Sequence, residues 1–134
     1  MTVDILARLD EMLDAVRATL AASDLSDKAL VTVSEDGRDV LNAMSLRAGA
    51  IIIYAYPAQE FPAPKVTKLT WTIGVVAHGE KVRDAATRVQ ALIDICAEAG
   101  IVRWADKATP TDFELADQAT VPGYAIAHIE EHID

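Results

Sequence analysis

Cysteine and positively charged residues are both scarce in this chain. A single cysteine, Cys96, stands among 134 residues, so no intrachain disulfide can form and nothing indicates an oxidising compartment. Lys and Arg number 12 against 21 Asp and Glu, which gives a net charge of −9. This charge argues against a non-specific nucleic-acid binder, which replaces counterions with basic side chains, and against binding to an anionic membrane surface.

Long apolar runs are also missing. The longest run, residues 48–56, is far shorter than the ~18 residues of a membrane-spanning helix. No basic segment followed by an apolar one opens the chain, so we expect no signal peptide and a protein made and folded in a cytoplasm. An apolar content of 51% and a mean hydropathy of +0.18 argue against disorder. The length predicts one domain spanning residues 1–134.

The sequence motifs of common catalytic and cofactor sites are absent. There is no GxGxxG or GxxxxGKS/T phosphate loop, no CxxC or HExxH, and no serine in a GxSxG elbow. We therefore predict that the protein is not an enzyme, with no catalytic residues, no metal and no cofactor. Cys96 falls on the apolar stripe of a predicted helix, which favours a buried, inert thiol over a nucleophile.

Residues 68–100 organise the predicted fold. Apolar residues alternate from Leu69 to Ala77, as in a strand with one face in a core. After a break at residues 78–80 the apolar period becomes helical, and Gly100 stands where a left-handed cap would end the helix. The predicted apolar stripe of this helix consists of Val82, Ala85, Val89, Leu92, Ile93 and Cys96.

The remaining elements complete an α+β prediction. An N-terminal helix with Thr2 as its N-cap is expected to run to about Ala22. Strands are predicted at 29–33, at 50–56 with both faces covered, from Phe113, and at 124–133 after a turn at Pro122 and Gly123. Residues 34–39 have turn chemistry, and residues 40–47 fit a helical turn or a strand. The order predicts a mostly antiparallel sheet with the N-terminal helix and the second long helix packed on one face.

Two further stretches each permit two interpretations. Residues 57–64 contain three prolines, which predict a stiff, exposed loop; Phe61 within it either folds back onto the domain or anchors a contact with another subunit. His128, Glu130 and His132 alternate near the end of the chain, so an extended strand points all three to one side. A solvated or intersubunit polar face is favoured there over a metal site, because most metal sites draw ligands from more than one element.

The C-terminal third carries a family resemblance. Residues 108–126, ATPTDFELADQATVPGYAI, resemble the closing hairpin of the tail terminator and tail-completion (head–tail joining) proteins of long-tailed bacteriophages. The chain length, the leading helix, the strand–helix unit and the closing PGY strand are similar to that group as well. The resemblance implies a structural virion protein of the tail or neck that forms a six-fold ring on the tail tube, stops its growth and presents a surface to the head connector.

The resemblance also sets expectations about partners. The expected partners are other copies of the chain, the tail tube protein and the head–tail connector protein. The net charge of −9 predicts no membrane partner, and it predicts that DNA passes through an acidic lumen without specific binding. Candidate subunit contacts are Tyr54, Phe61, Phe113 and Tyr124, aromatic residues near predicted turns. The alternatives are another phage neck or minor tail component, or a small cytosolic enzyme or ligand-binding domain.

Overall fold

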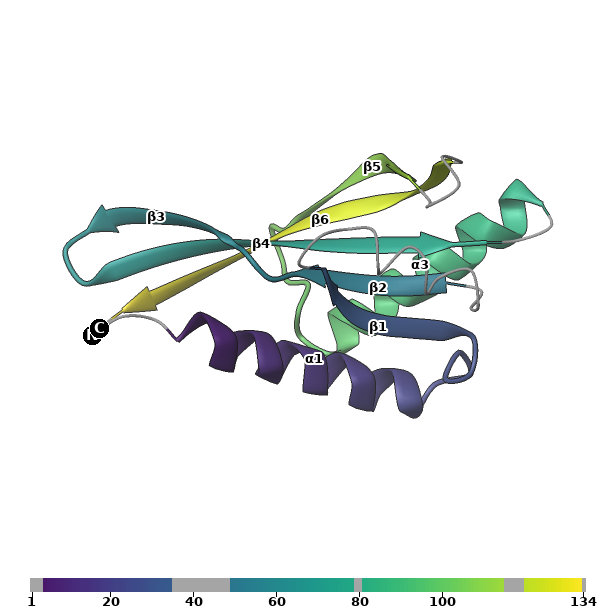
Figure 1. Ribbon diagram of the computed structural model, residues 1–134, viewed down its shortest axis with the longest axis horizontal. Coiled ribbons are helices and arrows are strands. Elements are labelled where there is room, and N and C mark those ends of the chain that lie inside the picture. Colours follow the sequence, from purple (N-terminus) through teal and green to yellow (C-terminus); the bar gives the residue numbers. More distant parts are fainter. Residues whose placement is uncertain (1–3, 35–48, 79–80, 115–119, 134) are drawn as a thin grey trace.

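Within the residues that the structure describes, the fold is a six-stranded sheet with two helices (Figure 1). The computed structural model describes residues 4–34, 49–78, 81–114 and 120–133. The elements are α1 (Ile5–Ala21), β1 (Ala29–Ser34), β2 (Gly49–Tyr54), β3 (Ala58–Ala63), β4 (Val66–Ala77), α3 (Val82–Glu98), β5 (Lys107–Glu114) and β6 (Thr120–Ile133). The strands are ordered β1-β2-β4-β6-β5, with β3 paired to β4. The β1–β2 pair is parallel and the other pairs are antiparallel, which confirms the predicted α+β class.

Both helices pack on the same face of the sheet. Leu9, Met12 and Val16 of α1 and Leu92 and Cys96 of α3 share one core cluster with inward-facing residues of β2, β4 and β6. Burial of such side chains contributes about 1.5–3 kcal/mol each relative to an exposed position. The two helices therefore cover a single continuous core.

The helix ends follow from specific residues. Asp4, and not Thr2 as predicted, caps α1, because its carboxylate accepts a hydrogen bond from the backbone N–H of Ala7. Gly100 has a φ of 81° after α3, as the sequence predicts. The N–H of Gly100 bonds to the carbonyl of Ala97, and the N–H of Ile101 bonds to the carbonyl of Cys96, the two bonds of a Schellman motif. The stripe prediction is wrong at Val82, whose side chain is exposed in the first turn.

β4 is the central strand of the sheet. It pairs with β2, β3 and β6, and its residues 73–77 are buried on both faces. The β2 strand beside it is buried from Gly49 to Ile53, which confirms the covered strand predicted there, but β2 ends at Tyr54 and Tyr56 is exposed, so the predicted extent to residue 56 is wrong. On the side away from the helices, Ala50, Ile52, Val76, Phe113 and Val121 form a second cluster. The centre of the sheet is thus a core element with both faces covered.

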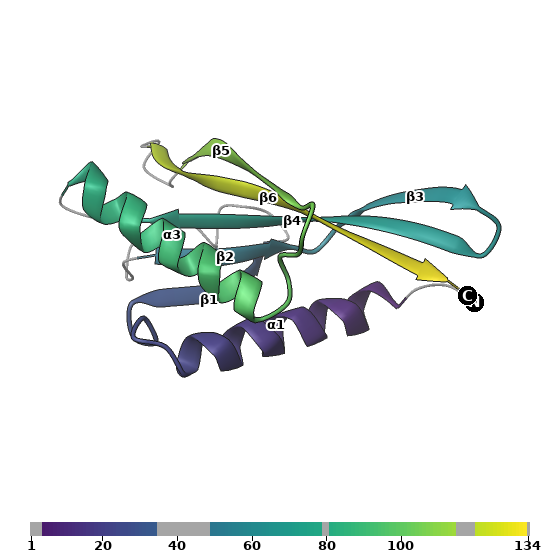
Figure 2. The same ribbon diagram turned by 180° about the vertical axis from the view of Figure 1, so that it is seen from behind.

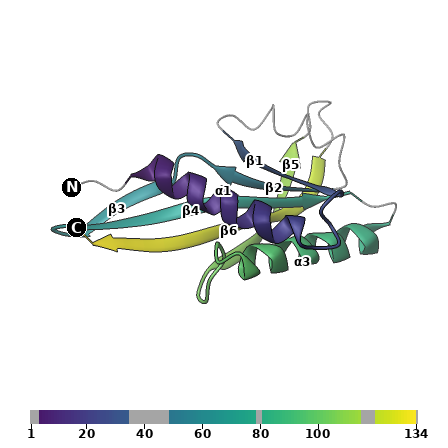
Figure 3. The same cartoon turned by 90° about the horizontal axis from the view of Figure 1, so that it is seen from below.

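At one end of the molecule β3 and the start of β4 form an arm, residues 58–68. The arm extends beyond both helices in each of the three views (Figures 1–3). The loop predicted at residues 57–64 is wrong, because Ala58–Ala63 pairs with β4 as an outer strand. Pro62 is accommodated because an outer strand has a free side and the register shifts between Glu60 and Ala63. Every residue of β3 is exposed, as the prediction for this stretch states.

The C-terminal hairpin differs from its predicted boundaries. β5 begins at Lys107 rather than at Phe113, so the strand also includes residues 107–112, for which the sequence predicts none. β6 begins at Thr120 and runs through Pro122 and Gly123, so the predicted turn at these residues is wrong. A Cβ at Gly123 would lie 2.2 Å from the carbonyl oxygen of Val75, so glycine here permits close approach of two strands instead of a turn.

The predictions for residues 35–39 and 40–47 lie outside the described residues. Within the described part of the chain, neither helix has the length and apolar character to cross a lipid bilayer.

Candidate functional site

β6 directs three titratable side chains toward α1. The predicted alternation of His128, Glu130 and His132 is confirmed, because Glu130 contacts both histidines. The sequence predicts a solvated or intersubunit polar face; His128 is fully buried and Glu130 is 5% exposed within the chain, so the solvated alternative is wrong for these two residues. They are buried because the helices cover this face of the sheet, and His132, nearer the strand end, is partly exposed.

Asp106 joins this group from the link between α3 and β5. Its Oδ2 lies 2.6 Å from Nδ1 of His128 and accepts a hydrogen bond of 2.8 Å from the backbone N–H of Arg103. Its Oδ1 accepts a hydrogen bond of 3.1 Å from the backbone N–H of Ile129. One carboxylate therefore fastens the link to two successive residues of β6.

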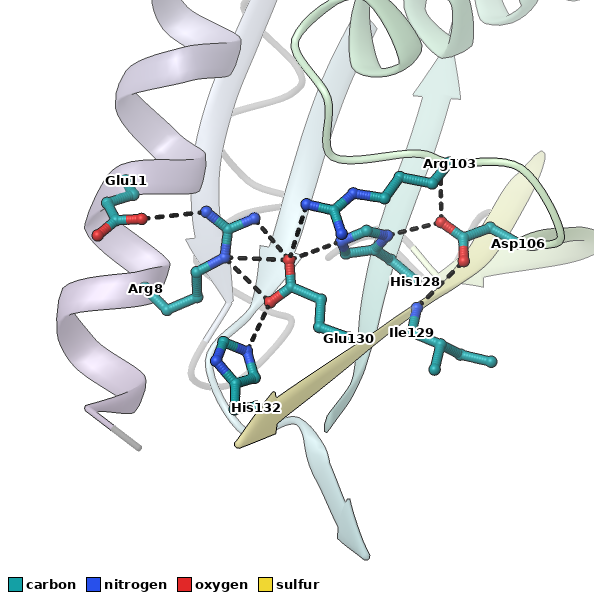
Figure 4. A network of polar contacts seen from close by, with 8 residues as sticks. All are labelled: Arg8, Glu11, Arg103, Asp106, His128, Ile129, Glu130 and His132. Carbon is teal, nitrogen blue, oxygen red and sulfur yellow. Dashed lines mark hydrogen bonds and ion pairs between the residues drawn. The ribbon is translucent and has the colours of Figure 1, made fainter. Parts of the chain in front are cut away.

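Glu130 connects β6 to α1 (Figure 4). The guanidinium of Arg8 donates to both carboxylate oxygens of Glu130 and also to Glu11. On the other side, Oε2 of Glu130 lies 2.9 Å from Nε2 of His128, and Nη2 of Arg103 is 3.9 Å away. We call Arg8, Asp106, His128 and Glu130 the buried network.

The two carboxylates of the buried network are stabilised in their ionised form. Both ring nitrogens of His128 face carboxylate oxygens, one of Asp106 and one of Glu130. Burial disfavours a charged Glu130, but the hydrogen bonds from Arg8 and His128 outweigh it and lower the pKa of Glu130 to about 2. The pKa of Asp106 is also lowered: burial opposes its ionisation, and the hydrogen bonds from His128 and two backbone N–H groups prevail. The two carboxylates are thus compensated by the guanidinium of Arg8 and by the hydrogen bonds that they receive.

This arrangement is suited to holding elements together. Each ring nitrogen of His128 is already engaged, and the ring has no solvent-exposed surface, so it cannot exchange a proton with a bound substrate in this conformation. Among the described residues, no group of three or more His, Cys, Asp and Glu side chains is arranged to hold a metal ion. The network links α1, the α3–β5 link and β6, three segments far apart in the sequence.

The α3–β5 link presents a tryptophan to solvent. The backbone N–H of Asp106 bonds to the carbonyl of Arg103, which closes a four-residue turn with Trp104 and Ala105 at its centre. The Trp104 side chain is 93% exposed, the highest value among the large apolar residues of the described chain. The link projects away from the sheet (Figure 3).

A groove lies at the other end of α3. Its volume is about 520 Å³, and it is lined by residues of the first turns of α3 and by Pro122, Gly123 and Tyr124 of β6. The lining is mostly apolar, with Val82, Ala86 and Tyr124 among its walls. Such a groove is large enough to receive a side chain or a small ligand.

The predicted contact residues lie in different environments. Phe61 is 72% exposed on the arm, so it does not fold back onto the domain. Tyr54 is half-buried at the end of β2, where burial raises the pKa of its phenol. Tyr124 is half-buried beside the groove. Phe113 is buried in the second core cluster, where its ring is committed to the chain's own packing.

Comparison of the chain with protein-family models, with curated proteins and with solved structures found no match.

Two members of the buried network have no signal in the local sequence. Arg8 lies on a half-polar helix 122 residues from Glu130, and Asp106 sits in a polar stretch 22 residues from His128. Trp104 is likewise unremarkable in the sequence, since an isolated tryptophan after a helix is usually buried. Only the His128-Glu130-His132 spacing marks the site before the fold is known.

Proposed function

We propose that the protein is a structural subunit that assembles with copies of itself into a closed ring, of the kind that ends the tail tube of a long-tailed bacteriophage and joins it to the head connector. The family resemblance of residues 108–126 suggests this role. The described fold supplies surfaces suited to it.

The observation that carries the proposal is the arm. β3 is exposed along its whole length, and the arm reaches past the helices that cover the rest of the sheet. Phe61 stands on it with 72% of its surface in solvent, and Tyr56 just before it is also exposed. In a monomer, an outer strand with an exposed aromatic ring leaves apolar surface in contact with water and unpaired backbone groups open to aggregation. Burial of the strand in a subunit interface removes both disadvantages.

The buried network favours this role over the enzyme alternative. Three groups with acid–base chemistry, Asp106, His128 and Glu130, are held in contacts with one another or with Arg8 beneath the helices. They stabilise the relative positions of three segments, which a ring subunit needs in order to present its contacts at fixed angles. A catalytic base would instead need a free nitrogen or oxygen facing a cavity.

The charge of the chain fits a ring around DNA. With a net charge of −9 on each copy, a ring repels phosphate and lets DNA slide without sticking. The proposed lumen is therefore acidic on balance. A ring whose hole is lined with Lys and Arg would contradict this part of the proposal.

Phe61→Ala tests the role of the arm. We expect the melting temperature of the Phe61→Ala variant to stay within about 2 °C of the wild-type value, because truncation of an exposed ring removes few contacts. We expect the assembled fraction, measured by sedimentation velocity, to fall steeply, because exposed aromatics are common interface anchors.

Leu6→Ala is the matched control for this experiment. Leu6 is 69% exposed on α1, so Leu6→Ala removes a comparable exposed apolar side chain from an element other than the arm. It should assemble like the wild type. If Phe61→Ala lowers the melting temperature by several degrees and leaves assembly intact, the arm is a folding element and the proposal loses its support. Binding of wild-type rings to the end of purified tail tubes distinguishes a terminator from another neck or minor tail component.

A further inference from the structure

The turn that carries Trp104 is strained and firmly held. Ala105 has a φ of 77° at the third position of the turn, where a type II turn ordinarily takes glycine. A non-glycine residue at positive φ costs about 1 kcal/mol or more and persists where surrounding contacts enforce it. Here the carboxylate of Asp106 enforces it through bonds to Arg103, His128 and Ile129.

This construction fixes the backbone at Trp104 before any partner binds. A rigid turn loses little backbone entropy on docking, so ordering of the ring itself is the main conformational cost of a contact here. Tryptophan is also the residue most enriched among the dominant contacts of interfaces. The exposed ring, with Arg103 and Lys107 exposed on either side in sequence, has the character of a preformed anchor.

The groove at the opposite end of α3 has matching chemistry. Its apolar walls and volume of about 520 Å³ can accept an indole ring. Lys81 lines it and can place an ammonium group against the face of the ring. Asp112 is exposed and pairs with Pro122 of the groove wall in the β5–β6 register, so it lies beside the groove and offers a carboxylate to Arg103 or Lys107.

The positions of the turn and the groove point to a second copy as the occupant. α3 has 17 residues, so its ends are about 25 Å apart and Trp104 cannot reach the groove of its own chain. The Trp104 turn at one end of α3 and the groove at the other end can form a head-to-tail contact between two copies. Repetition of this contact closes into a ring when a whole number of the rotations between neighbouring copies completes a full turn. We propose that Trp104 of one copy inserts between α3 and β6 of the next copy.

This inference rests on the proposed ring and names one of its contacts. A buried tryptophan removes about 150–250 Å² from solvent, whereas a standard interface buries about 800 Å² on each partner. The Trp104 contact is therefore an anchor within a larger interface, and the arm is available to supply more of the area. Loss of the anchor should weaken assembly and leave the fold of each copy intact.

Tryptophan fluorescence follows the contact directly. The chain has two tryptophans; Trp71 is fully buried and gives a constant background, while Trp104 is exposed in the isolated chain. On assembly we expect the emission of the wild type to shift to shorter wavelength and its quenching by acrylamide to fall. Trp104→Phe should show neither change when it assembles, which assigns the signal to this ring.

Two variants test the two sides of the contact. Trp104→Ala removes the indole ring, and Ala86→Arg fills the groove from an exposed position of α3. Each should weaken assembly about tenfold or more, as expected for loss of a dominant interface contact. Ala18→Arg, at an exposed position of α1, is the matched control and should assemble normally. Circular dichroism and thermal melting establish that each variant folds.

The outcomes separate this inference from the ring proposal. If the wild type stays monomeric at every protein and salt concentration, the ring proposal is wrong, and the proposed Trp104 contact is wrong as well. If the wild type forms rings, while Trp104 stays open to acrylamide and Ala86→Arg assembles like Ala18→Arg, the ring stands and the Trp104 contact is wrong. Protection of Trp104 together with selective loss of assembly in both contact variants supports the contact.

Discussion

Glu130→Gln should be among the most destabilising conservative substitutions in this protein. The glutamine has nearly the same shape, so packing is preserved while the negative charge is lost. Arg8 and His128 both donate to the Glu130 carboxylate, and an amide presents them with one acceptor oxygen and one competing donor. The substitution therefore leaves the partly buried guanidinium of Arg8 without its compensating charge and weakens the hydrogen bond between His128 and residue 130.

The size of the effect follows from the pKa of Glu130. Lowering of this pKa from 4.5 to about 2 corresponds to about 3 kcal/mol of favourable interaction with the ionised form. Removal of one partner from a buried ion pair costs about 3–5 kcal/mol in other proteins. We expect a loss of about 3 kcal/mol in the free energy of unfolding and a fall of roughly 10 °C in melting temperature at pH 7.

The dependence of stability on pH is an independent test of the interactions of the ionised Glu130 carboxylate. Because the folded-state pKa of Glu130 is lower than the unfolded value, its contribution is complete above about pH 4.5 and is lost as pH falls toward about 2. The stability difference between wild type and Glu130→Gln should therefore shrink across this window. Denaturant titrations followed by circular dichroism at pH 7, 5, 4 and 3 measure it.

Glu131→Gln is the control for this prediction. Glu131 is the next residue of β6 and is exposed, so its substitution removes the same charge with an expected change of about 0.5 kcal/mol or less. If Glu130→Gln proves no more destabilising than Glu131→Gln, the buried network does not hold α1 to β6 as described.

Three further predictions concern the core, the sheet and the charge. Burial raises the pKa of the Cys96 thiol to about 12, so a thiol reagent should label it only as the protein unfolds, and rapid labelling of native protein at pH 8 would contradict this. Gly123→Ala should cost about 2 kcal/mol or more in denaturant titrations because its methyl group would collide with the carbonyl of Val75, and a neutral result would show that the strands can separate. The assembled fraction should rise between 0.01 M and 0.15 M salt, since the Debye length falls from ~30 Å to ~8 Å, and sedimentation showing a steady decline would refute it.

The elements that form the core could be predicted from the sequence. Alternation identified β4, the unbroken run Ile51–Ile53 identified β2 as covered on both faces, and the helical period identified α1 and α3 within a few residues. These patterns exist because one face of each helix and both faces of the central strands must be apolar to pack. The position of Gly100 was predictable because helices commonly end at a residue with positive φ, which is usually glycine.

Two outer strands, β3 and the first half of β5, could not be predicted in this way. β3 is exposed at every position, and the first half of β5 is polar with Pro110, so neither carries the period of a half-buried strand. Their backbone pairs with β4 and β6, and that pairing is invisible to a pattern of side chains. Pro122 and Gly123 read as a turn because the close approach to Val75 that requires glycine is a tertiary contact.

The candidate site was predictable only in part. The spacing of His128, Glu130 and His132 correctly indicated a shared face, but not that the face is covered. Burial depends on Arg8, which the fold brings to Glu130 from 122 residues away and which supplies the compensating charge. From sequence alone, a charged residue such as Glu130 is expected to lie in solvent. The cation that allows Glu130 to be buried, Arg8, is known only from the fold.

The mass and shape of the purified protein test the central claim most directly. Multi-angle light scattering after gel filtration at physiological salt, with negative-stain microscopy of the same fraction, measures both. Assembly as a six-fold ring predicts a particle six times the 14.4 kDa of one chain, about 86 kDa, with a central hole. A mass of 14.4 kDa at every concentration and salt, with no rings in the images, would contradict the proposal that this protein is a ring subunit.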